Sequence, residues 1–330
     1  MTSTLMHPFS KRRSQNRFGL VTAFCLTALA MVYLSHALPG FLPGDFVTAM
    51  YAGSYVTLSE EQEAELKAFY NTDETFGNYL LRLLRLDWGY SYAFLSPVSS
   101  LFFEALPWTL FLMGTAHLLS MGLGFVAGVE AAWRRNRFIE RGLVGGLTVL
   151  EGVPEISTGV LLLLIFALHL GWFPAAGAET AYADFTLWGR VGDVVSHLVL
   201  PLTTLVAAYF PGNFLLARNS MMLVVTAPYV TTARAKGLPP RRVRYAHAAR
   251  NALLPLVTRF GLRFAFMITG ALVVERINAY PGLGTLLFNA IQARDLPVIQ
   301  GVVLMSSLMV LAVILGLEVI YRMLDPRISY

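Results

Sequence analysis

The sequence predicts an all-α, polytopic membrane protein with six transmembrane helices and both termini on the cytoplasmic side. Two observations carry this prediction. The 330 residues are 56% hydrophobic and only 14% charged, and the hydrophobic residues form long runs with few or no charges. A helix that crosses a bilayer needs about 20 apolar residues, and the chain contains six runs of about this length or longer. The charged loops between these runs then fix the orientation.

The six runs define the domain organisation. They are Phe18–Leu38, Ala105–Val129, 142–172, Val194–Ala217, Pro255–Val274 and Leu296–Leu317. We therefore expect a tail over 1–17, a first transmembrane helix over 18–38, an external segment with short helices over 39–104, and a core over 105–330 with five transmembrane helices. The first run could instead be a signal peptide, because basic residues precede it. However, it is long for one and lacks a clear small-residue cleavage site, which favours a retained helix.

The distribution of basic residues predicts the topology. Of the 25 Lys and Arg residues, 17 lie in the two tails and in the loops on the same side, six lie in the other loops, and two lie inside the fifth run. Loops on the cytoplasmic side of a membrane carry the excess of Lys and Arg. Both termini are therefore expected in the cytoplasm. The same asymmetry explains the net charge of +5 without a nucleic-acid partner.

The external segment contains one clear helix start. Ser59 precedes Glu60, Glu61, Gln62 and Glu63, so its hydroxyl can cap a helix whose first turn places acids near the positive end of the dipole. We expect a solvated surface helix there, with docking of a partner protein as the alternative.

A basic hairpin interrupts the apolar core. Seven cations and no carboxylate lie between Arg218 and Arg250. Gly237 is placed to end a first short helix over 229–236, and Leu238-Pro239-Pro240 cannot continue it. A second helix over 241–251 would carry Val243, Ala246 and either Ala249 or Arg250 near one face. Such a surface hairpin suits either a groove on another protein or an anionic lipid surface.

This hairpin resembles the cytoplasmic coupling loop, or EAA loop, of permease subunits in bacterial binding-protein-dependent ABC importers. The residues that the resemblance places in the loop (218–255) are Thr231, Thr232, Ala233, Arg234, Lys236, Gly237, Arg241, His247, Asn251 and Pro255. Thr231 stands where the family pattern has Glu, which excludes a salt bridge from that position. The spacing to Leu254-Pro255 is similar to that of the dipeptide, oligopeptide and nickel class.

Two further stretches strengthen the resemblance. Residues 275–301 resemble the loop of this class between the last two helices, and Leu324-Asp325-Pro326-Arg327 resembles its terminus. The resemblance implies a type I ABC importer permease fold in the bacterial inner membrane. It also implies partners: a second permease, two ATPase subunits that bind ATP and Mg, and an external binding protein. The chain itself would hold no cofactor, catalyse no reaction, and conduct a peptide, nickel or a metal chelate.

Charged residues inside the expected spans form a second set of candidates. Glu151 and Glu155 are four residues apart, which predicts one shared helix face, and so are Arg259 and Arg263. Membrane-embedded charges are costly, and they pair with one another or line an aqueous path. We expect the two pairs to face each other, either as a structural ion-pair cluster or along the solute path. Glu275 is a further candidate of this kind.

Two other classes of protein remain possible from these residues. A polytopic membrane enzyme could use Glu151 and Glu155 for acid–base chemistry, but no nucleophile or metal-ligand pattern accompanies them. A secondary transporter could use the same charges, but it is expected to contain an internal repeat, and none is visible.

Overall fold

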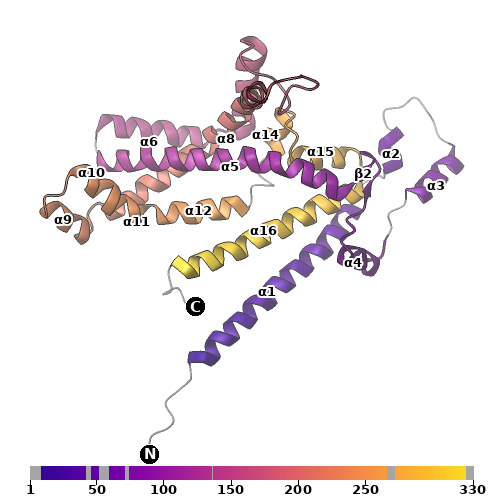
Figure 1. Cartoon of the computed structure of the whole chain (residues 1–330), viewed down its shortest axis with the longest axis horizontal. Helices are drawn as coiled ribbons and strands as arrows, with labels where there is room; N and C mark the ends of the chain where they lie inside the picture. The colour runs from indigo at the N-terminus through magenta and orange to yellow at the C-terminus, as the bar shows by residue number, and fades with distance from the viewer. Residues whose placement is uncertain are drawn as a thin grey trace, which may run out of the picture. The chain divides into compact units, whose positions relative to one another are not determined.

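The computed structural model describes residues 9–41, 46–51, 59–70, 74–135, 137–265 and 272–324. Within these ranges the chain is almost wholly helical, and the only strands are the short pair β1 (Tyr90–Ser91) and β2 (Ser96–Pro97) (Figure 1). The chain divides into two compact units, Met1–Phe102 with Asn289–Tyr330, and Phe103–Phe288. Each unit is described by itself.

Three described helices are long and apolar enough to cross a membrane. They are α5 (Val98–Trp133), α8 (Leu187–Val224) and the part Leu296–Gly316 of α16 (Leu296–Leu324). A fourth crossing results if the bent pair Phe138–Glu151 and Glu155–His169 is one span. The first expected span overlaps α1 (Phe9–Ala37). The fifth overlaps α12 (Leu254–Ala265) and the start of α14 (Leu272–Ile277), and its residues 266–271 lie outside the described ranges. The count of six therefore stays a prediction.

The first unit holds η1 (Leu38–Phe41), α2 (Phe46–Tyr51), α3 (Glu60–Phe69) and α4 (Phe76–Leu84) besides α1 and α16, which contact each other. The predicted cap of α3 is confirmed. The Ser59 hydroxyl accepts from the Gln62 amide at 3.3 Å, and the Gln62 side chain accepts from the Ser59 amide at 3.1 Å. This reciprocal arrangement satisfies two backbone donors that a helix start otherwise leaves unpaired.

A buried carboxylate fastens the strand pair of this unit. Asp295 precedes α16 and is 1% exposed. Its Oδ2 accepts from the Ser91 hydroxyl at 2.6 Å and from the Ala93 amide at 3.0 Å. Because a buried acceptor needs such partners, Asp295 holds the turn between β1 and β2 against the start of α16.

Helix α8 is the centre of the second unit. The other elements are α6 (Phe138–Glu151), α7 (Glu155–Leu162), the π-helical η2 (Leu163–His169), α9 (Pro228–Ala235), α10 (Pro240–Arg242), the π-helical η3 (Val243–Ala249), α11 (Arg250–Ala252), α14 (Leu272–Ile277) and α15 (Leu283–Gln292). Of these, α6, α7, η3, α11, α12 and α14 all contact α8.

Two glycines let α5 approach α8 closely. A Cβ added at Gly124 would lie 2.8 Å from the Asn213 Cβ, and one added at Gly128 would lie 2.6 Å from the Phe214 carbonyl oxygen. Gly124 and Gly128 are four residues apart and therefore lie on one helix face. Small residues at this spacing bring the backbones of membrane helices into contact.

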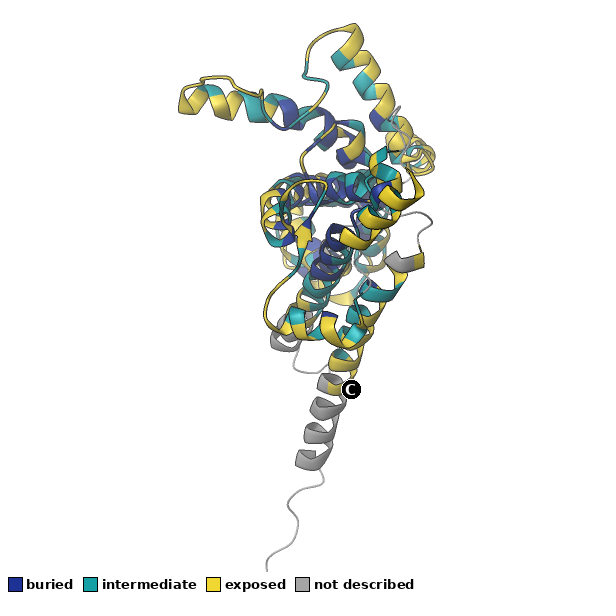
Figure 2. Ribbon diagram, turned by 90° about the vertical axis from the view of Figure 1, so that its right-hand side faces the viewer, coloured by how far each residue is buried: buried dark blue, intermediate teal, exposed yellow. Residues whose placement is uncertain are grey.

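Many residues of the helices are exposed (Figure 2), and large apolar side chains are among them. On α6, for example, Phe138 is 91% exposed and Val149 is 73% exposed. Apolar patches of this kind are avoided on soluble proteins but are expected on helices that contact lipid or a partner subunit.

Candidate functional site

The first arm of the basic hairpin is the two-turn helix α9. Pro228 occupies its first turn, where a missing N–H costs nothing. Val230 and Ala233 are 0% and 5% exposed and pack in a cluster with Val129 and Met221. Thr231, Thr232, Arg234 and Lys236 are exposed on the other faces. The helix therefore presents a polar surface outward from an apolar seat.

Gly237 ends this arm as predicted. Its φ is +73°, a left-handed conformation that glycine adopts without steric cost. Gly237 is exposed, and a Cβ added there would meet nothing within 4 Å. The glycine is therefore required by the backbone conformation and not by a close neighbour.

The second arm is helical as expected, but its buried face differs from the prediction. Val243 and Ala249 are buried, whereas Ala246 is exposed and Ala248 is buried in its place. The reason is that residues 243–249 are π-helical, and this wider turn shifts the periodicity on which the prediction relied. A face derived from 3.6 residues per turn is wrong there.

An aromatic side chain joins the hairpin to the end of α5. The guanidinium carbon of Arg234 lies 4.8 Å from the ring centroid of Trp133, and that of Arg244 lies 5.0 Å from it. Arginine over a tryptophan face is attracted by the negative ring face. Trp133 therefore contacts one cation from each arm of the hairpin.

A carboxylate one turn earlier completes this contact. Glu130 forms an ion pair with Arg244, accepts from the Tyr245 hydroxyl at 2.8 Å, and lies 3.4 Å from Arg134. Burial and the Glu130 carboxylate raise the pKa of the Tyr245 phenol, which donates its proton to this hydrogen bond. We call Glu130, Trp133, Arg234, Arg244 and Tyr245 the hairpin clamp.

The acidic partners of the hairpin are not evident from the sequence. The hairpin region holds seven cations and no carboxylate, but Arg244 pairs with Glu130, 114 positions away, and Arg218 pairs with the buried Glu140. The available signal was the position of Glu130 and Glu140 beside the other basic loop. Their pairing with the hairpin arises only from the packing of α5 and α6.

The remaining coupling-loop candidates have ordinary local roles or face outward. The Asn251 amide donates to the Tyr229 hydroxyl at 2.7 Å, which ties the two arms together. The Thr232 hydroxyl bonds back to the Pro228 carbonyl at 3.0 Å. Arg241 and Pro255 are exposed, and His247 is half-buried.

The third expected span is broken, and this corrects one prediction. Glu151 is the last residue of α6, and Glu155 is the first residue of α7. The two helical segments are bent by 95° relative to each other. Pro154 has no N–H to continue the helix and disfavours helical geometry at Val153. Glu151 and Glu155 therefore do not share the face of one continuous helix.

The first acid nevertheless lies beside an arginine of α12. Arg259 Nη1 donates to the Gly212 carbonyl at 2.8 Å. A Cβ added at Gly212 would lie 2.7 Å from Arg259 Nη2 and 2.9 Å from Glu151 Oε1. The absence of a side chain at Gly212 thus leaves room for both head groups on this face of α8.

The second acid and arginine lie around Tyr209, about one turn away on α8. The guanidinium carbon of Arg263 is 4.8 Å from the Tyr209 ring centroid. Glu155 interacts electrostatically with both Arg263 and Tyr209. The imidazole of His117 stacks on Tyr209 with centroids 4.7 Å apart. We call Glu151, Glu155, Arg259 and Arg263, with Gly212 and Tyr209 between them, the charged cluster of α8.

Glu275 is placed differently from these charges. It is 0% exposed, and its carboxylate accepts from the Thr109 hydroxyl at 2.6 Å and from the amides of Gly284 and Thr285 at 2.7 and 3.3 Å. The ion pairs of the described ranges do not include Glu275. Since Gly284 and Thr285 lie in the first turn of α15 (Leu283–Gln292), Glu275 caps that helix.

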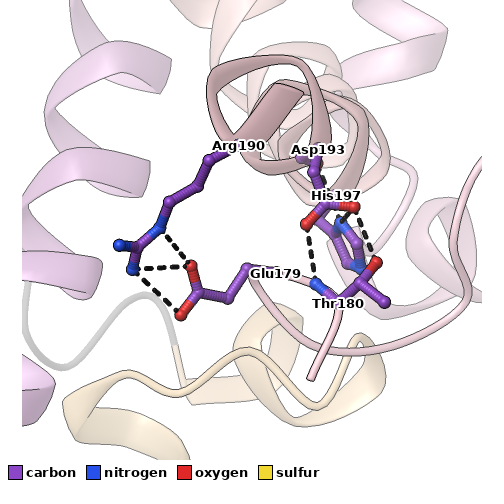
Figure 3. A network of polar contacts seen from close by, with 5 residues as sticks. All are labelled: Glu179, Thr180, Arg190, Asp193 and His197. Carbon is purple, nitrogen blue, oxygen red and sulfur yellow. Dashed lines mark hydrogen bonds and ion pairs between the residues drawn. The ribbon is translucent and has the colours of Figure 1, made fainter. Parts of the chain in front are cut away.

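Figure 3 shows a polar network that fastens the loop before α8. Arg190 Nε donates to Glu179 Oε2 at 3.0 Å. Thr180 donates to Asp193 through its amide at 2.7 Å and through its hydroxyl at 2.6 Å. The ring nitrogen Nδ1 of the buried His197 lies 2.8 Å from the Asp193 carbonyl oxygen. Two neighbouring loop residues are thereby held to the first two turns of α8.

The described residues contain no group of three or more His, Cys, Asp or Glu that could hold a metal ion. The long apolar helices define a multi-pass integral membrane protein.

Comparison with known proteins identifies the family. The model for the inner membrane component of binding-protein-dependent transport systems matches residues 120–330. The chain is 33% identical to the oligopeptide transport system permease protein AppB of Bacillus subtilis (strain 168). The 306 aligned residues cover 92% of this chain and 95% of the relative. It is 34% identical to a putative peptide transport system permease protein of Brucella abortus (strain 2308), with the same coverage. It is 33% identical to the glutathione transport system permease protein GsiC of Salmonella choleraesuis (strain SC-B67), over 94% of this chain and 96% of the relative.

The chain belongs to the family of binding-protein-dependent transport system inner membrane components and is a permease subunit of an ABC importer. The suspected resemblance is thus confirmed. Membership in this family also decides against the secondary transporter and the membrane enzyme as alternative classes.

Proposed function

We propose that this chain forms half of the solute path of an ATP-driven importer for short peptides or peptide-like solutes in the bacterial inner membrane. The names of its relatives, which include oligopeptide, peptide and glutathione permeases, support this substrate class. Nickel and metal chelates, the other solutes that the sequence resemblance implied, have no such support.

The proposal assigns the remaining parts of the transporter to partners. A second, homologous permease forms the other half of the path, two ATPase subunits bind ATP and Mg, and an external binding protein delivers the solute. In the proposed topology of six transmembrane helices with both termini in the cytoplasm, the basic hairpin lies on the side of the ATPases. The chain itself holds no cofactor and catalyses no reaction in this scheme.

The observation that carries the proposal is the hairpin clamp. Helix α9 rests on an apolar cluster, and the clamp attaches both arms of the hairpin to the end of α5. A displacement of α9 by a docked partner would therefore be transmitted to α5 through these contacts. This is the property that a coupling element needs, because an ATPase can shift the permease only through contacts that differ between its own two states.

The charge of the exposed surface indicates what docks there. Arg234, Lys236, Arg241, Arg242 and Arg250 are all exposed. A groove with acidic residues on the ATPase would complement them and would speed association. Anionic lipid is the competing partner for the same cations.

Crosslinking tests the docking directly. The free Cys25 is exposed, so it is first replaced in Cys25→Ser. Thr232→Cys, on the exposed face of α9, is then treated in native membranes with a short bifunctional maleimide–photoreactive reagent, and the products are identified by mass spectrometry. We expect an adduct with an ATPase subunit whose yield changes when ATP is trapped in place of ADP.

Ala183→Cys is the matched control. It is also exposed but lies in the loop before α8, which lies outside in the proposed topology. An adduct of the ATPase with Ala183→Cys, or only lipid adducts at Thr232→Cys, would contradict the proposed role of α9.

A further inference from the structure

We propose that the charged cluster of α8 is a binding site for the charged ends of a zwitterionic solute such as a short peptide. The inference rests on the proposed function and adds to it the residues that contact the solute. It begins with the arrangement of the charges. Two acid–arginine neighbours lie about one turn apart along α8, the first at Gly212 and the second at Tyr209.

These charges are neighbours, but they do not form closed ion pairs. The ion pairs within 4.0 Å among the described residues include Arg218 with Glu140 and Arg244 with Glu130, but none of the four charges of the cluster. Arg259 uses one donor on the Gly212 carbonyl. A guanidinium offers five donors, so most of the hydrogen-bonding capacity of the cluster remains for a ligand.

The depth of the cluster argues that it faces water. Tyr209 and Gly212 lie inside the uncharged run Val194–Ala217, roughly 8–12 Å from its cytoplasmic end at the rise of an α-helix. Glu151 is exposed in the isolated chain, and the other three charges are half-buried. Charged side chains at such depth avoid lipid and face a partner or a water-filled cavity. In a permease pair, the solute path is a water-filled cavity of this kind, and the inference assigns the cluster to it.

The mixed charge indicates the class of ligand. Arginine binds a carboxylate through paired, charge-assisted hydrogen bonds, and a glutamate accepts from an ammonium group. A peptide with free termini carries one group of each kind, so it complements both. The cluster is also neutral as a whole, so a simple anion or cation gains less from it. A site on a transport path must bind weakly enough to release its solute. Here water and the opposite charges of the cluster itself compete with the solute, so binding is weak.

The test compares one peptide with and without its terminal carboxylate. Inverted vesicles are unsuitable because the binding protein acts outside, so the complete importer is reconstituted in proteoliposomes with the binding protein outside and ATP inside. Uptake of radiolabelled trialanine and of trialanine amide is measured for the wild type and for Arg263→Gln. The ratio of variant to wild type is taken for each peptide separately, so any preference of the binding protein cancels.

We expect Arg263→Gln to lower the uptake of trialanine about tenfold, the effect of losing a hydrogen-bonded charge pair, and to leave the uptake of the amide nearly unchanged. Glu155→Gln should likewise lower the uptake of trialanine and leave the uptake of N-acetyl-trialanine, which lacks the terminal ammonium, nearly unchanged. The control Arg135→Gln removes an exposed charge from the loop before α6 and should affect all three peptides alike.

If Arg263→Gln lowers the uptake of trialanine and of trialanine amide equally, Arg263 acts only in folding or assembly, and the proposed site is overturned. Unchanged uptake of both peptides would overturn it as well. ATP-dependent uptake without discrimination would leave the proposed function standing and remove the inference alone. No ATP-dependent uptake of trialanine by the wild type would overturn the proposed function for such peptides, and the site with it.

Discussion

Glu275 illustrates what a single buried residue contributes to the fold. Its carboxylate accepts from one hydroxyl and two amides. We predict that Glu275→Met, which keeps the volume but offers no comparable acceptor, lowers the free energy of unfolding by about 3 kcal/mol, because buried donors are left unpaired. Glu275→Gln keeps one carbonyl oxygen and should cost less. Thermal unfolding of the purified chain in detergent measures both.

Thr109 provides the control for this prediction. Its hydroxyl donates to Glu275 and accepts from the Leu283 amide at 2.8 Å, so Thr109→Ser should be nearly neutral and Thr109→Val clearly destabilising. Equal stability of the Met and Gln variants at position 275 would show that volume, and not hydrogen bonding, is what Glu275 supplies.

Residues whose role is local could be predicted from the sequence, and those with distant partners could not. The left-handed conformation of Gly237 and the cap by Ser59 follow from nearest neighbours, and both are confirmed. Glu130 and Trp133 acquire their roles from residues more than 90 positions away. A single sequence contains no signal for such a pairing beyond complementary charge.

Helix packing between α5 and α8 leads to a second prediction. Gly128→Ala adds a methyl group that meets the backbone of α8 at 2.6 Å. Neither helix can move aside without losing other contacts, so we expect a loss of about 1–3 kcal/mol despite the better helix propensity of alanine. The midpoint of unfolding by denaturant reports this loss.

Gly122 is the matched control on the same helix, since a Cβ there would meet nothing within 4 Å. Gly122→Ala should be neutral or slightly stabilising. If both variants behave alike, the close approach of α5 and α8 is not a constraint on stability.

The hairpin clamp supports a prediction that separates coupling from folding. Glu130→Arg places two arginines in contact and should abolish the stimulation of ATP hydrolysis by loaded binding protein. Glu130→Arg with Arg244→Glu restores opposite charges at the same positions and should recover a substantial part of that stimulation. The measurement is ATPase activity of the reconstituted importer with and without binding protein.

The double variant also decides between interpretations. If each single variant assembles poorly and the double variant assembles no better, the ion pair between Glu130 and Arg244 does not order the hairpin. Loss of assembly is read separately by copurification of the ATPase.

The broken third span shows the limit of hydropathy as a predictor of elements. An apolar run over 142–172 satisfies the length of a transmembrane helix, and the two acids satisfy the four-residue spacing. Both patterns ignore Pro154, which forces the chain to turn by 95° at that point. The turn changes which side chains lie together, so that Glu151 reaches Gly212 and Glu155 lies near Tyr209.

For the chain as a whole, this break raises the question of how many times the backbone crosses the membrane. The bent pair is either one broken crossing or a re-entrant loop. Each segment is about 20 Å long at the rise of an α-helix. At this bend the two outer ends of the pair are separated by roughly 30 Å, which is the thickness of the hydrocarbon core. The geometry therefore permits a full crossing. The four arginines between Arg134 and Arg141 on one side, against Arg190 alone on the other, favour one.

We therefore predict that Arg135 and Ala183, on either side of the bent pair, face opposite sides of the membrane. Arg135→Cys and Ala183→Cys are each introduced into the Cys25→Ser background. Both are labelled with an impermeant maleimide in spheroplasts and in inverted vesicles. Ala183→Cys should react only in spheroplasts and Arg135→Cys only in inverted vesicles. If both react from the same side, the pair is re-entrant, the number of crossings becomes odd, and the two termini lie on opposite sides of the membrane. If both react only in spheroplasts, the basic hairpin, which α8 separates from Ala183, stays on the cytoplasmic side, and only the topology of the first half of the chain changes. If both react only in inverted vesicles, the hairpin lies outside and its role as a coupling surface is contradicted.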